Sequence, residues 1–438
     1  MGIKVVKFGG SSLASAEQVQ KVIDIISADE GRAYVVPSAP GKRFDGDTKV
    51  TDLLLSAYAQ AQAGQSPVGT VQEIASRYTQ IMEGLGVRLD LSQEWEALTQ
   101  QLVSGASRDY VASRGEYFSG RVLAQALGYA FVEPASYVRF QPNGAFDSET
   151  TQQLLSQALS QAPRAVIPGF YGGYADGQIK TFSRGGSDVT GAIVARAVDA
   201  EVYENWTDVS GFLMADPRIV DHPKRIEKLT YRELRELSYM GAQVLHEDSI
   251  FPVRQAGIPI HILNTNAPTD PGTLIVKDAP VNRTGRVTGI AGHKGFSLIL
   301  IEKAMMNSEL GFVRRALTVL EKQHISVEHI PTGIDTLSVV VSNEELDGKL
   351  DAVLAGIQEQ VQPDHMEVVE NLALIATVGR GMVRQPGTAA ALFEALASQG
   401  INLRMIDQGS SELNIIVGVD NQHFEEAVRA IYHRFVRR

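Results

Sequence analysis

Apolar runs alternate with amphipathic ones from Ile3 to Leu263, and this alternation constrains the fold more than any other feature of the chain. The run 3–8 predicts a strand, and the apolar spacing within 16–27 predicts a helix that Ser15 can cap. Repeated strand–helix units are typical of a mainly parallel sheet with helices on both faces. We therefore expect an α/β domain whose ligands bind at the carboxyl ends of its strands.

The same pattern places the other elements of this region. Strands are expected at 33–36, near Phe131 and Val138, and at 165–167, 179–182, 202–205 and 258–263, with helices at 50–63, 68–84, 91–105 and 114–127. Proline and glycine then crowd the segment from Pro268 to Gly285, which favours a domain boundary. We expect a first domain over 1–280, a linker over 281–290, and two small modules over 291–365 and 366–438.

The C-terminal region contains an internal repeat with a period of 76 positions. Five positions align without a gap: Gly311 with Gly387, Leu320 with Leu396, Ile325 with Ile401, Gly333 with Gly409, and Leu337 with Leu413. Each copy predicts strand, helix, strand, turn and strand, the strands lying at 296–301, 325–330 and 336–341, then at 372–378, 401–406 and 412–419. A tandem pair of α+β modules indicates a binding unit and not a second catalytic centre.

Charge and composition exclude several classes of function. The 438 residues carry a net charge of −11, which argues against nucleic acid as a partner and against an anionic membrane surface. The chain has no cysteine, which excludes disulfides, a thiolate nucleophile and Cys-ligated zinc. Because we find neither a secretory leader nor an apolar run of membrane-spanning length, we expect a cytoplasmic protein without a membrane partner.

The first predicted strand runs into Lys7-Phe8-Gly9-Gly10-Ser11-Ser12. Glycines allow the backbone to approach a ligand closely and to adopt positive φ angles. Backbone N–H groups at the start of a helix can then face an anion, and Lys7 adds an ammonium group. No Gly-x-x-x-x-Gly-Lys-Ser/Thr sequence occurs, so this is not a Walker-type loop. By itself the segment fits a phosphate site and an ordinary turn equally well.

Four other segments of the first domain add polar groups to this loop. Ser113-Arg114-Gly115-Glu116 opens a predicted helix, and Phe182-Ser183-Arg184-Gly185-Gly186-Ser187-Asp188 forms a second glycine-rich anion loop with an arginine suited to a carboxylate. The segment 205–211 ends a strand, and Ala215-Asp216-Pro217-Arg218 follows it. Two anion loops, several acids and an arginine in one α/β domain favour phosphoryl transfer to a small acid.

Taken in order, these segments resemble the aspartokinase family. The resemblance rests on 7–12, 113–116, 184–188, and Thr207-Asp208-Val209 followed by 216–218. The C-terminal repeat is similar to the tandem ACT modules of that family, above all through Gly379-Arg380-Gly381-Met382 and the segment 409–414. The resemblance covers essentially the whole chain. It implies an amino-acid-kinase-type sheet sandwiched by helices over 1–280, followed by two βαββαβ-like ACT modules.

The resemblance implies a monofunctional, ATP-dependent aspartate kinase, which makes 4-phospho-L-aspartate from L-aspartate in the first step of lysine, threonine and methionine biosynthesis. Mg²⁺ is implied on the phosphates, without a protein metal site. Lys7 is the implied partner of the transferred charge, and Asp188 orients Lys7 or the metal shell. The implied ATP-binding residues are Lys7, Phe8, Gly9, Gly10, Ser11, Ser38, Thr207, Asp208, Leu213, Arg218 and Gln243. The implied substrate-binding residues are Thr51, Glu116, Arg184, Gly185, Gly186 and Ser187, with Glu116 on the ammonium and Arg184 on the α-carboxylate of aspartate.

The chain departs from the family pattern near the nucleotide. Gln243 stands where several members carry a lysine, Leu213 stands where many carry a tyrosine, and Glu247-Asp248 replaces a proline-led continuation. These differences leave the nucleotide contacts open. We expect Arg218 to carry more of the phosphate charge as a result.

The ACT pair implies inhibition by an end-product amino acid, with L-lysine the expected effector and threonine the alternative. Such pairs bind the effector between two chains, so we expect a homodimer or a larger homo-oligomer. The candidate effector residues are Ser308, Glu309, Gly311, Thr332 and Asp335. The rival functions are a glutamate or acetylglutamate kinase, a uridylate-type kinase, and a non-catalytic amino-acid sensor. Paired ACT modules argue against the first of these, the amino-acid clamp against the second, and the intact site residues against the third.

Overall fold

The computed structural model describes residues 2–183, 185–242, 245, 250–279 and 286–436. The chain divides into two compact units, the first formed by 1–212, 227–231 and 243–279, and the second by 213–226, 232–242 and 280–438. Two short segments ahead of the predicted boundary, 213–226 and 232–242, therefore pack with the C-terminal modules. Within the described ranges, no helix combines the length and the apolar character needed to cross a membrane.

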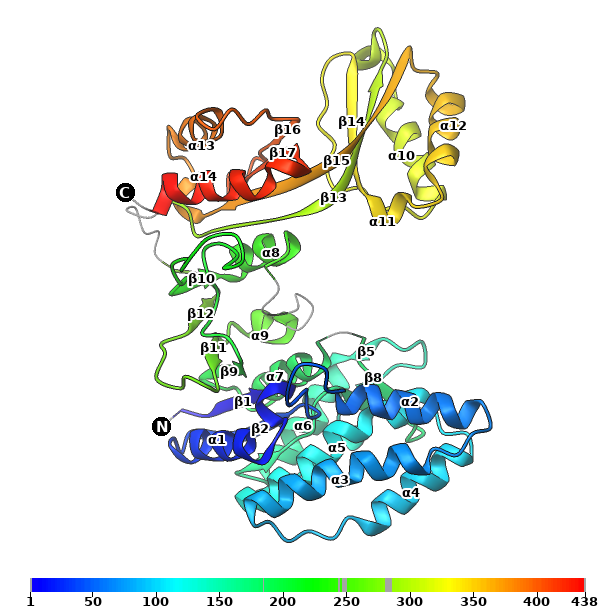
Figure 1. Ribbon diagram of the computed structural model, residues 1–438, viewed down its shortest axis with the longest axis vertical. Coiled ribbons are helices and arrows are strands. Elements are labelled where there is room, and N and C mark those ends of the chain that lie inside the picture. The colour runs from blue at the N-terminus through cyan, green and yellow to red at the C-terminus, as the bar shows by residue number, and fades with distance from the viewer. Residues whose placement is uncertain (1, 184, 243–244, 246–249, 280–285, 437–438) are drawn as a thin grey trace. The chain divides into compact units, whose positions relative to one another are not determined.

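The first unit is built on a sheet in the order β10-β12-β11-β9-β1-β2-β6-β3 (Figure 1). Its strands are β1 (Lys4–Phe8), β2 (Arg32–Pro37), β3 (Ala130–Phe131), β6 (Ala165–Val166), β9 (Val202–Thr207), β10 (Lys228–Thr230), β11 (Ile260–Asn264) and β12 (Thr273–Val276). The neighbouring pairs are parallel except β11 with β12. This confirms the predicted α/β fold, and it brings the carboxyl ends of β1, β2 and β9 together at one edge.

Helices pack against this sheet, and a smaller sheet of β4 (Arg139–Phe140), β5 (Phe146–Asp147), β7 (Tyr171–Gly173) and β8 (Ile179–Thr181) accompanies it. The helices are α1 (Ala16–Ser27), α2 (Val50–Gln62), α3 (Val68–Leu85), α4 (Ser92–Val103), α5 (Arg108–Leu127), α6 (Ser148–Ser160), α7 (Gly186–Ala197) and α9 (Phe251–Ala256). Ser15 caps α1 as predicted, with its side chain accepting from the N–H of Gln18.

Helix α5 differs from its prediction in where it begins. The Ser107 hydroxyl accepts a hydrogen bond from the Tyr110 N–H at 3.1 Å, so the helix begins at Arg108 and not at Arg114. The segment 113–116 therefore lies in the interior of a helix whose central residues are buried, and Glu116 is not a helix-start charge.

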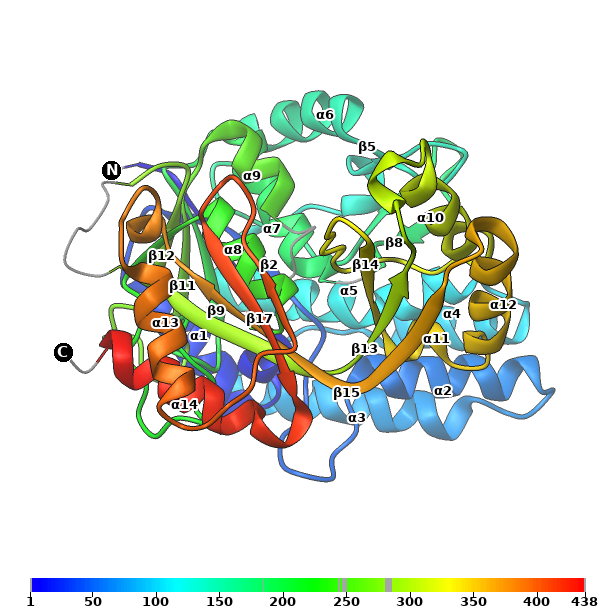
Figure 2. The same ribbon diagram turned by 90° about the horizontal axis from the view of Figure 1, so that it is seen from above.

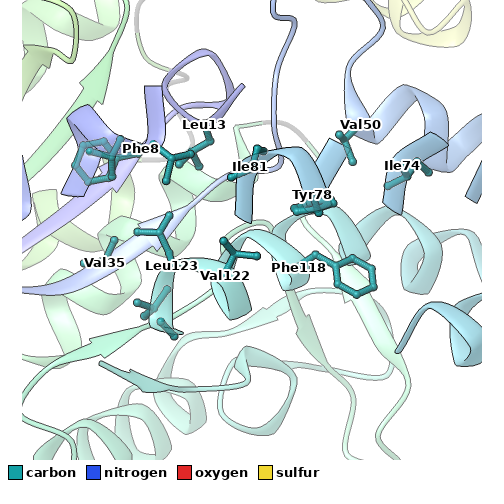
Figure 3. Packing of buried hydrophobic residues seen from close by; sticks show 14 of the residues in the cluster. Phe8, Leu13, Val35, Val50, Ile74, Tyr78, Ile81, Phe118, Val122 and Leu123 are labelled. Atoms are coloured by element: carbon teal, nitrogen blue, oxygen red, sulfur yellow. The ribbon is translucent and has the colours of Figure 1, made fainter. Parts of the chain in front are cut away.

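A hydrophobic core lies between the sheet and helices α1 to α5 (Figure 3). Phe8 and Leu13, from the first strand and the turn after it, are buried in this core together with Val35 of β2. Tyr78 and Phe118 hold α3 against α5, with ring centroids 5.6 Å apart. The Tyr78 hydroxyl donates to the carbonyl of Gly115 at 2.6 Å. The core thus anchors the first loop and the middle of α5 to one rigid support.

The second unit contains one antiparallel sheet in the order β14-β13-β15-β17-β16. Its strands are β13 (Gly289–Glu302), β14 (Thr336–Ser342), β15 (His365–Val378), β16 (Met405–Asp407) and β17 (Asn414–Asp420). Helices α10 (Phe312–Lys322), α11 (Asn343–Leu346) and α12 (Leu350–Val361) belong to the first repeat, and α13 (Thr388–Ala397) and α14 (Phe424–Val436) to the second. β13 and β15 run side by side along their length, so both repeats share this sheet (Figures 1 and 2).

The two repeats adopt matching local structure. Gly311 and Gly387 both cap the repeat helices in the left-handed conformation, with φ of 78° and 84°. The strand predicted at 325–330 in the first copy, however, is wrong: this segment makes only an isolated bridge, between His329 and Val340. The Ser326 N–H instead donates to the Glu345 side chain. In the second copy, the predicted strand 401–406 is reduced to β16.

Helix α8 (Tyr231–Tyr239) begins in the first unit at Tyr231, and its residues from 232 onward belong to the second unit. Glu233 is fully buried there, with a carboxylate oxygen 2.8 Å from the guanidinium Nε of Arg380. Thr288 donates to the same carboxylate at 2.6 Å. Asn414 donates to Glu236, one helical turn further on, at 2.5 Å. Within the second unit, α8 is therefore tied to the antiparallel sheet and the turn after β15 by two acidic residues.

Candidate active site

Lys7 and Asp188 form the centre of the site. The ammonium nitrogen of Lys7, in β1, lies 2.5 Å from Oδ1 of Asp188, in the first turn of α7. Both side chains are largely buried. Asn205 is paired with Lys7 across β1 and β9, and its amide donates to the same Asp188 oxygen at 2.8 Å. A lysine held in this way presents a fixed positive charge at the carboxyl edge of the sheet.

The first glycine loop continues directly from Lys7. Gly9 donates to the carbonyl of Trp206 at 3.0 Å, and its φ is −69°, so the backbone is extended there. A Cβ on Gly9 would lie 3.8 Å from the Lys7 ammonium, which is ordinary contact distance. A Cβ on Gly10 would instead meet the Ala39 carbonyl at 2.8 Å. Gly10 is therefore required for close backbone packing, whereas a Cβ on Gly9 would lie beside the ammonium group without a clash.

The remaining residues of this segment divide between core and surface. The Phe8 side chain is buried and stacks on Trp206, so only its backbone can face a ligand. Ser11 is exposed in the 3₁₀ turn Gly10–Leu13. Ser12 is buried and shares a hydrogen bond of 2.8 Å with Thr265. Ser11 is thus the hydroxyl that a ligand can reach.

The second glycine loop positions Asp188. Gly185 caps α7 with a φ of 57°, a left-handed conformation that favours glycine. A Cβ on Gly186 would lie 2.5 Å from the Phe170 ring, so α7 begins in close contact with the chain before β7. Ser187 is buried next to Asp188. Arg184, the implied carboxylate ligand, lies outside the described residues.

Glu116 is a buried carboxyl group with unmet hydrogen-bonding capacity. It is 5% exposed, and burial raises its pKa to about 8, an effect that the Ala39 N–H and the charges of Arg114 and Lys7 partly oppose. Within the described part of the chain, its Oε2 atom is buried and has no hydrogen-bond partner. Buried polar atoms in folded proteins are nearly always paired. Glu116 is therefore suited to bind a cationic or hydrogen-bonding ligand.

Most of the other implied residues of the first unit lie at the same strand ends, and Thr51 lies at the start of a helix. Ser38 follows β2, and its N–H donates to the Phe8 carbonyl at 3.1 Å. Thr51 lies in the first turn of α2 and is half-buried. Thr207 ends β9, and its hydroxyl donates to the exposed Asp208 at 3.2 Å. The pairing of β1 with β2 and β9 thus brings Ser38 and Thr207 to the edge where Lys7 lies.

The other three implied nucleotide residues are Leu213, Arg218 and Gln243. Gln243 lies outside the described residues. Leu213 and Arg218 belong to the second unit. The Arg218 side chain is 87% exposed, and its guanidinium contacts both carboxylate oxygens of Asp216, the shortest contact being 2.6 Å. Any phosphate contact by Arg218 would therefore compete with an existing ion pair.

The candidate effector residues come together in the first of the two C-terminal repeats. The Asp335 carboxylate accepts from the Met305 N–H at 2.9 Å, and the Ile334 carbonyl accepts from the Asn307 N–H at 3.1 Å. The loop before α10, with Ser308 and Gly311, is thereby held beside the turn that follows Thr332. Glu309 is 2.7 Å from the Lys303 ammonium.

Sequence reasoning missed Asn205 and Ala39, which contact Asp188 and Glu116 respectively. Asn205 lies in a quoted segment, but the pairing of β1 with β9, and not any local pattern, makes it face Asp188. The sequence signal for Asn205 was its position at the start of the polar segment 205–211, which ends a strand. Ala39 contributes through its backbone, for which the side chain gives no signal.

A mainly parallel α/β domain with two glycine-rich anion loops, followed by a duplicated α+β sheet, defines an amino acid kinase joined to a regulatory region. Family models agree: residues 2–264 match the amino acid kinase family, and residues 375–435 match the ACT domain. The chain is 38% identical to aspartokinase 3 of Bacillus subtilis, with 99% of this chain and 98% of the relative covered. The chain belongs to the aspartokinase family and is an ATP-dependent kinase.

Solved structures extend the comparison to three dimensions. The aspartate kinase of Clostridium acetobutylicum is 50% identical with a TM-score of 0.92, covering 99% of this chain and 100% of that one. Aspartokinase III of E. coli, in complex with aspartate and ADP in the R-state, is 25% identical with a TM-score of 0.77, and each chain is fully covered. The same enzyme with lysine and aspartate, in the T-state, gives a TM-score of 0.74 at 25% identity, with 99% of both chains covered.

Proposed function

We propose that this chain transfers the γ-phosphoryl group of ATP to the β-carboxylate of L-aspartate, giving 4-phospho-L-aspartate. The observation that carries the proposal is the buried Glu116 carboxyl, whose Oε2 atom has no hydrogen-bond partner among the described residues, in the same domain as the fixed Lys7–Asp188 pair. The Glu116 carboxyl suits the α-ammonium of an amino acid, and the Lys7 ammonium suits a phosphoryl group in transfer. The aspartate and ADP bound to aspartokinase III of E. coli support this pairing of ligands.

The chemistry requires alignment and charge neutralisation more than it requires a base. A carboxylate is already a nucleophile at neutral pH, so phosphoryl transfer to it depends on placing two anions in line and stabilising the charge that spreads over the phosphoryl oxygens. Lys7 supplies a preorganised positive charge for this purpose, because Asp188 and Asn205 fix its position before substrate arrives. Gly9 leaves room beside the ammonium for a phosphate oxygen.

The amino acid would be held at both of its α-substituents. Glu116 would pair with the α-ammonium, and Arg184 would bind the α-carboxylate in the bidentate manner of arginine. Ser38, Thr51 and Ser187 would complete the polar lining. These contacts select an amino acid over a simple diacid, because a ligand without the ammonium would leave the buried Glu116 carboxyl unpaired.

Mg²⁺ is proposed to enter with ATP. Among the described residues, no group of three or more acidic or histidine side chains is arranged to hold a metal ion. The ion would be bound by phosphate oxygens, and Asp188, beside Lys7, would orient its water shell. When bound, such an ion neutralises phosphate charge. Thr207, Asp208, Leu213, Arg218 and Gln243 are the proposed nucleotide contacts.

Inhibition by an end-product amino acid is part of the proposal, with L-lysine as the effector. The lysine-bound T-state of aspartokinase III of E. coli supports this choice. The start of α10 would receive the effector carboxylate, and Asp335 its ammonium group. Inhibition follows when lysine binds an inactive arrangement more tightly than the active one.

A homodimer formed through the ACT region and a place in the cytoplasm complete the proposal. Leu310 and Ile334 support the homodimer, because their side chains are 94% and 71% exposed in the first module. Such apolar exposure favours burial against a second chain. Sedimentation of the purified protein, at several concentrations, would give the oligomeric state.

A coupled assay of ADP release tests the function. The enzyme is supplied with aspartate, glutamate or acetylglutamate, each with and without lysine or threonine. We expect the highest kcat/KM with aspartate and inhibition by lysine. Faster turnover with glutamate would overturn the substrate, and activity unaffected by either effector would remove the regulatory part of the proposal.

A further inference from the structure

One buried arginine closes the loop between β2 and α2. Arg77, in α3, is 4% exposed, and its guanidinium donates to the Gly41 carbonyl at 2.7 Å and to the Thr48 carbonyl at 2.5 Å. These carbonyls lie at the two ends of the segment 41–48, which we call the Arg77 loop. Because the two bonds come from one rigid group, they fix the separation of the loop ends.

Asp47 reinforces this closure from within the loop. Its Oδ2 atom lies 3.4 Å from the Arg77 guanidinium and 2.9 Å from Nε of Arg43. Arg43 also donates from Nη2 to the other carboxylate oxygen at 3.0 Å, and its backbone N–H donates to Oδ2 at 3.0 Å. Hydrogen bonds from Arg43 hold the pKa of Asp47 well below its usual range, with the charge of Arg77 adding to the effect. The carboxylate is therefore charged throughout the neutral range.

The Arg77 loop in turn supports the phosphate loop. The Gly41 N–H donates to the Gly10 carbonyl at 2.7 Å. The two glycines are packed so closely that a Cβ on Gly41 would lie 2.8 Å from the Gly10 carbonyl carbon. At the other end, the Val50 N–H donates to the Pro40 carbonyl at 3.1 Å, directly before Thr51. A shift of the Arg77 loop would therefore move Gly10 and the start of α2 together.

We infer that Arg77 is a positioning residue for phosphoryl transfer, which acts by holding the Arg77 loop against Gly10. The inference rests on the proposed function, because Gly10 and Thr51 are taken as ATP and aspartate contacts. Arg77 itself reaches neither ligand in this scheme. Its contribution is geometric: misplacement of reacting groups by about 1 Å can cost roughly 100-fold in rate. Lysine cannot replace it, since one ammonium cannot reproduce the planar fork that holds two carbonyls.

The test combines kinetics with limited trypsin digestion. Lys42, Arg43 and Lys49 are exposed trypsin sites in or next to the loop, and cleavage there requires the loop to open. The variants are Arg77→Lys, Arg77→Gln and Asp47→Asn. The Asp47→Asn substitution removes the carboxylate charge that faces Arg77 and leaves Arg77 and every trypsin site in place. Arg88→Ala is the matched control, because Arg88 is an exposed arginine just beyond the same helix.

We expect cleavage in the Arg77 loop to be at least about tenfold faster in the Arg77 and Asp47 variants than in the wild type and the control. We also expect kcat to fall by roughly 10- to 100-fold in the Arg77 variants, with a smaller fall for Asp47→Asn. If the Arg77 variants do not fold, Asp47→Asn decides the question. Loop cleavage unchanged from wild type would overturn the inference, as would faster cleavage with unaltered kcat and KM. If the wild type does not phosphorylate aspartate, the proposed function fails, and the digestion alone still reports whether Arg77 holds the loop.

Discussion

The ammonium group of Lys7 and the carboxylate of Asp188 lie 2.5 Å apart, although one residue lies in the first strand and the other in the first turn of a helix much later in the chain. The amide of Asn205 fixes the same carboxylate oxygen at 2.8 Å. A charge held by two neighbours requires little reorganisation when a phosphoryl group arrives, which is the basis of electrostatic stabilisation in enzymes. The proposed catalytic role of the site depends on this pair.

Lys7→Ala is expected to lower kcat by about 100-fold or more, because loss of one preorganised charge-stabilising donor typically costs 10² to 10³ in rate. The fold and lysine binding should remain, since the Lys7 side chain makes its close contact with Asp188 at the site edge. Steady-state ADP release, with thermal unfolding alongside, provides the measurement. Lys21→Ala removes an exposed ammonium from α1 and serves as the control. Near-normal turnover by Lys7→Ala would refute the assigned role.

Glu116 should make stability depend on pH. Burial raises its pKa to about 8 in the folded chain, so between its ordinary pKa, about 4.3, and pH 8 the folded state holds a proton that the unfolded state has lost. This contribution to stability is complete below the ordinary pKa and is lost as the pH rises through 8. Without ligand, Glu116→Gln should therefore lose less stability than wild type when the pH is raised from about 6 to about 9, as measured by denaturant unfolding.

The same substitution tests the binding role of Glu116. A bound ammonium group would lower the pKa of the carboxyl again, so aspartate binding near neutral pH should release a proton. Calorimetry in buffers of different ionisation enthalpy measures this release, which Glu116→Gln should abolish together with most of the affinity for aspartate. Glu96→Gln, at an exposed position of α4, is the control. Identical pH profiles for the wild type and Glu116→Gln would contradict the assignment.

The two glycines of the first loop should respond differently to alanine. A Cβ on Gly10 would lie 2.8 Å from the Ala39 carbonyl, so Gly10→Ala should lower the free energy of unfolding by about 1–3 kcal/mol. A Cβ on Gly9 has only ordinary contacts, so Gly9→Ala should fold normally. It would, however, fill space beside the Lys7 ammonium and raise the KM for ATP. Unfolding curves and ATP titrations separate the two effects, and equal destabilisation of both variants would argue against this division.

Asp335 offers a test of the effector site. Its carboxylate accepts a backbone hydrogen bond from Met305, which asparagine can also accept, so Asp335→Asn should keep the loop in place. Loss of the charge should raise the lysine concentration for half-inhibition by about tenfold or more, because hydrogen bonds to charged groups contribute about 1.5–3 kcal/mol. Turnover without lysine should not change. Inhibition curves measure this, with the exposed Asp347→Asn as control; superimposable curves would rule out Asp335 as a ligand.

The patterns that sequence reasoning handled well are local ones. The strand ending at Phe8 and the capped helix α1 depend on neighbours within a few positions, and both are confirmed. The register of the repeat is also local to each copy, and Gly311 and Gly387 confirm it with the same left-handed cap. The strand predicted at 325–330 failed because a side chain takes the place of a strand partner: the Ser326 N–H donates to Glu345, and pairing with β14 is confined to a bridge between His329 and Val340. The apolar pattern of the segment gives no sign of such a side-chain partner.

By itself, the sequence determined the α/β class, the duplicated C-terminal region, the family, and which residue types stand at the strand ends. Only the tertiary structure decided how those residues work together. Burial of Glu116 in the interior of the first unit raises its pKa, and strand pairing sets Asn205 beside Asp188. Arg77 reads as an ordinary helix residue until the fold places it between two loop carbonyls. The physical reason is common to all three: desolvation and hydrogen bonding depend on what surrounds a group in space, and those surroundings come from remote parts of the chain.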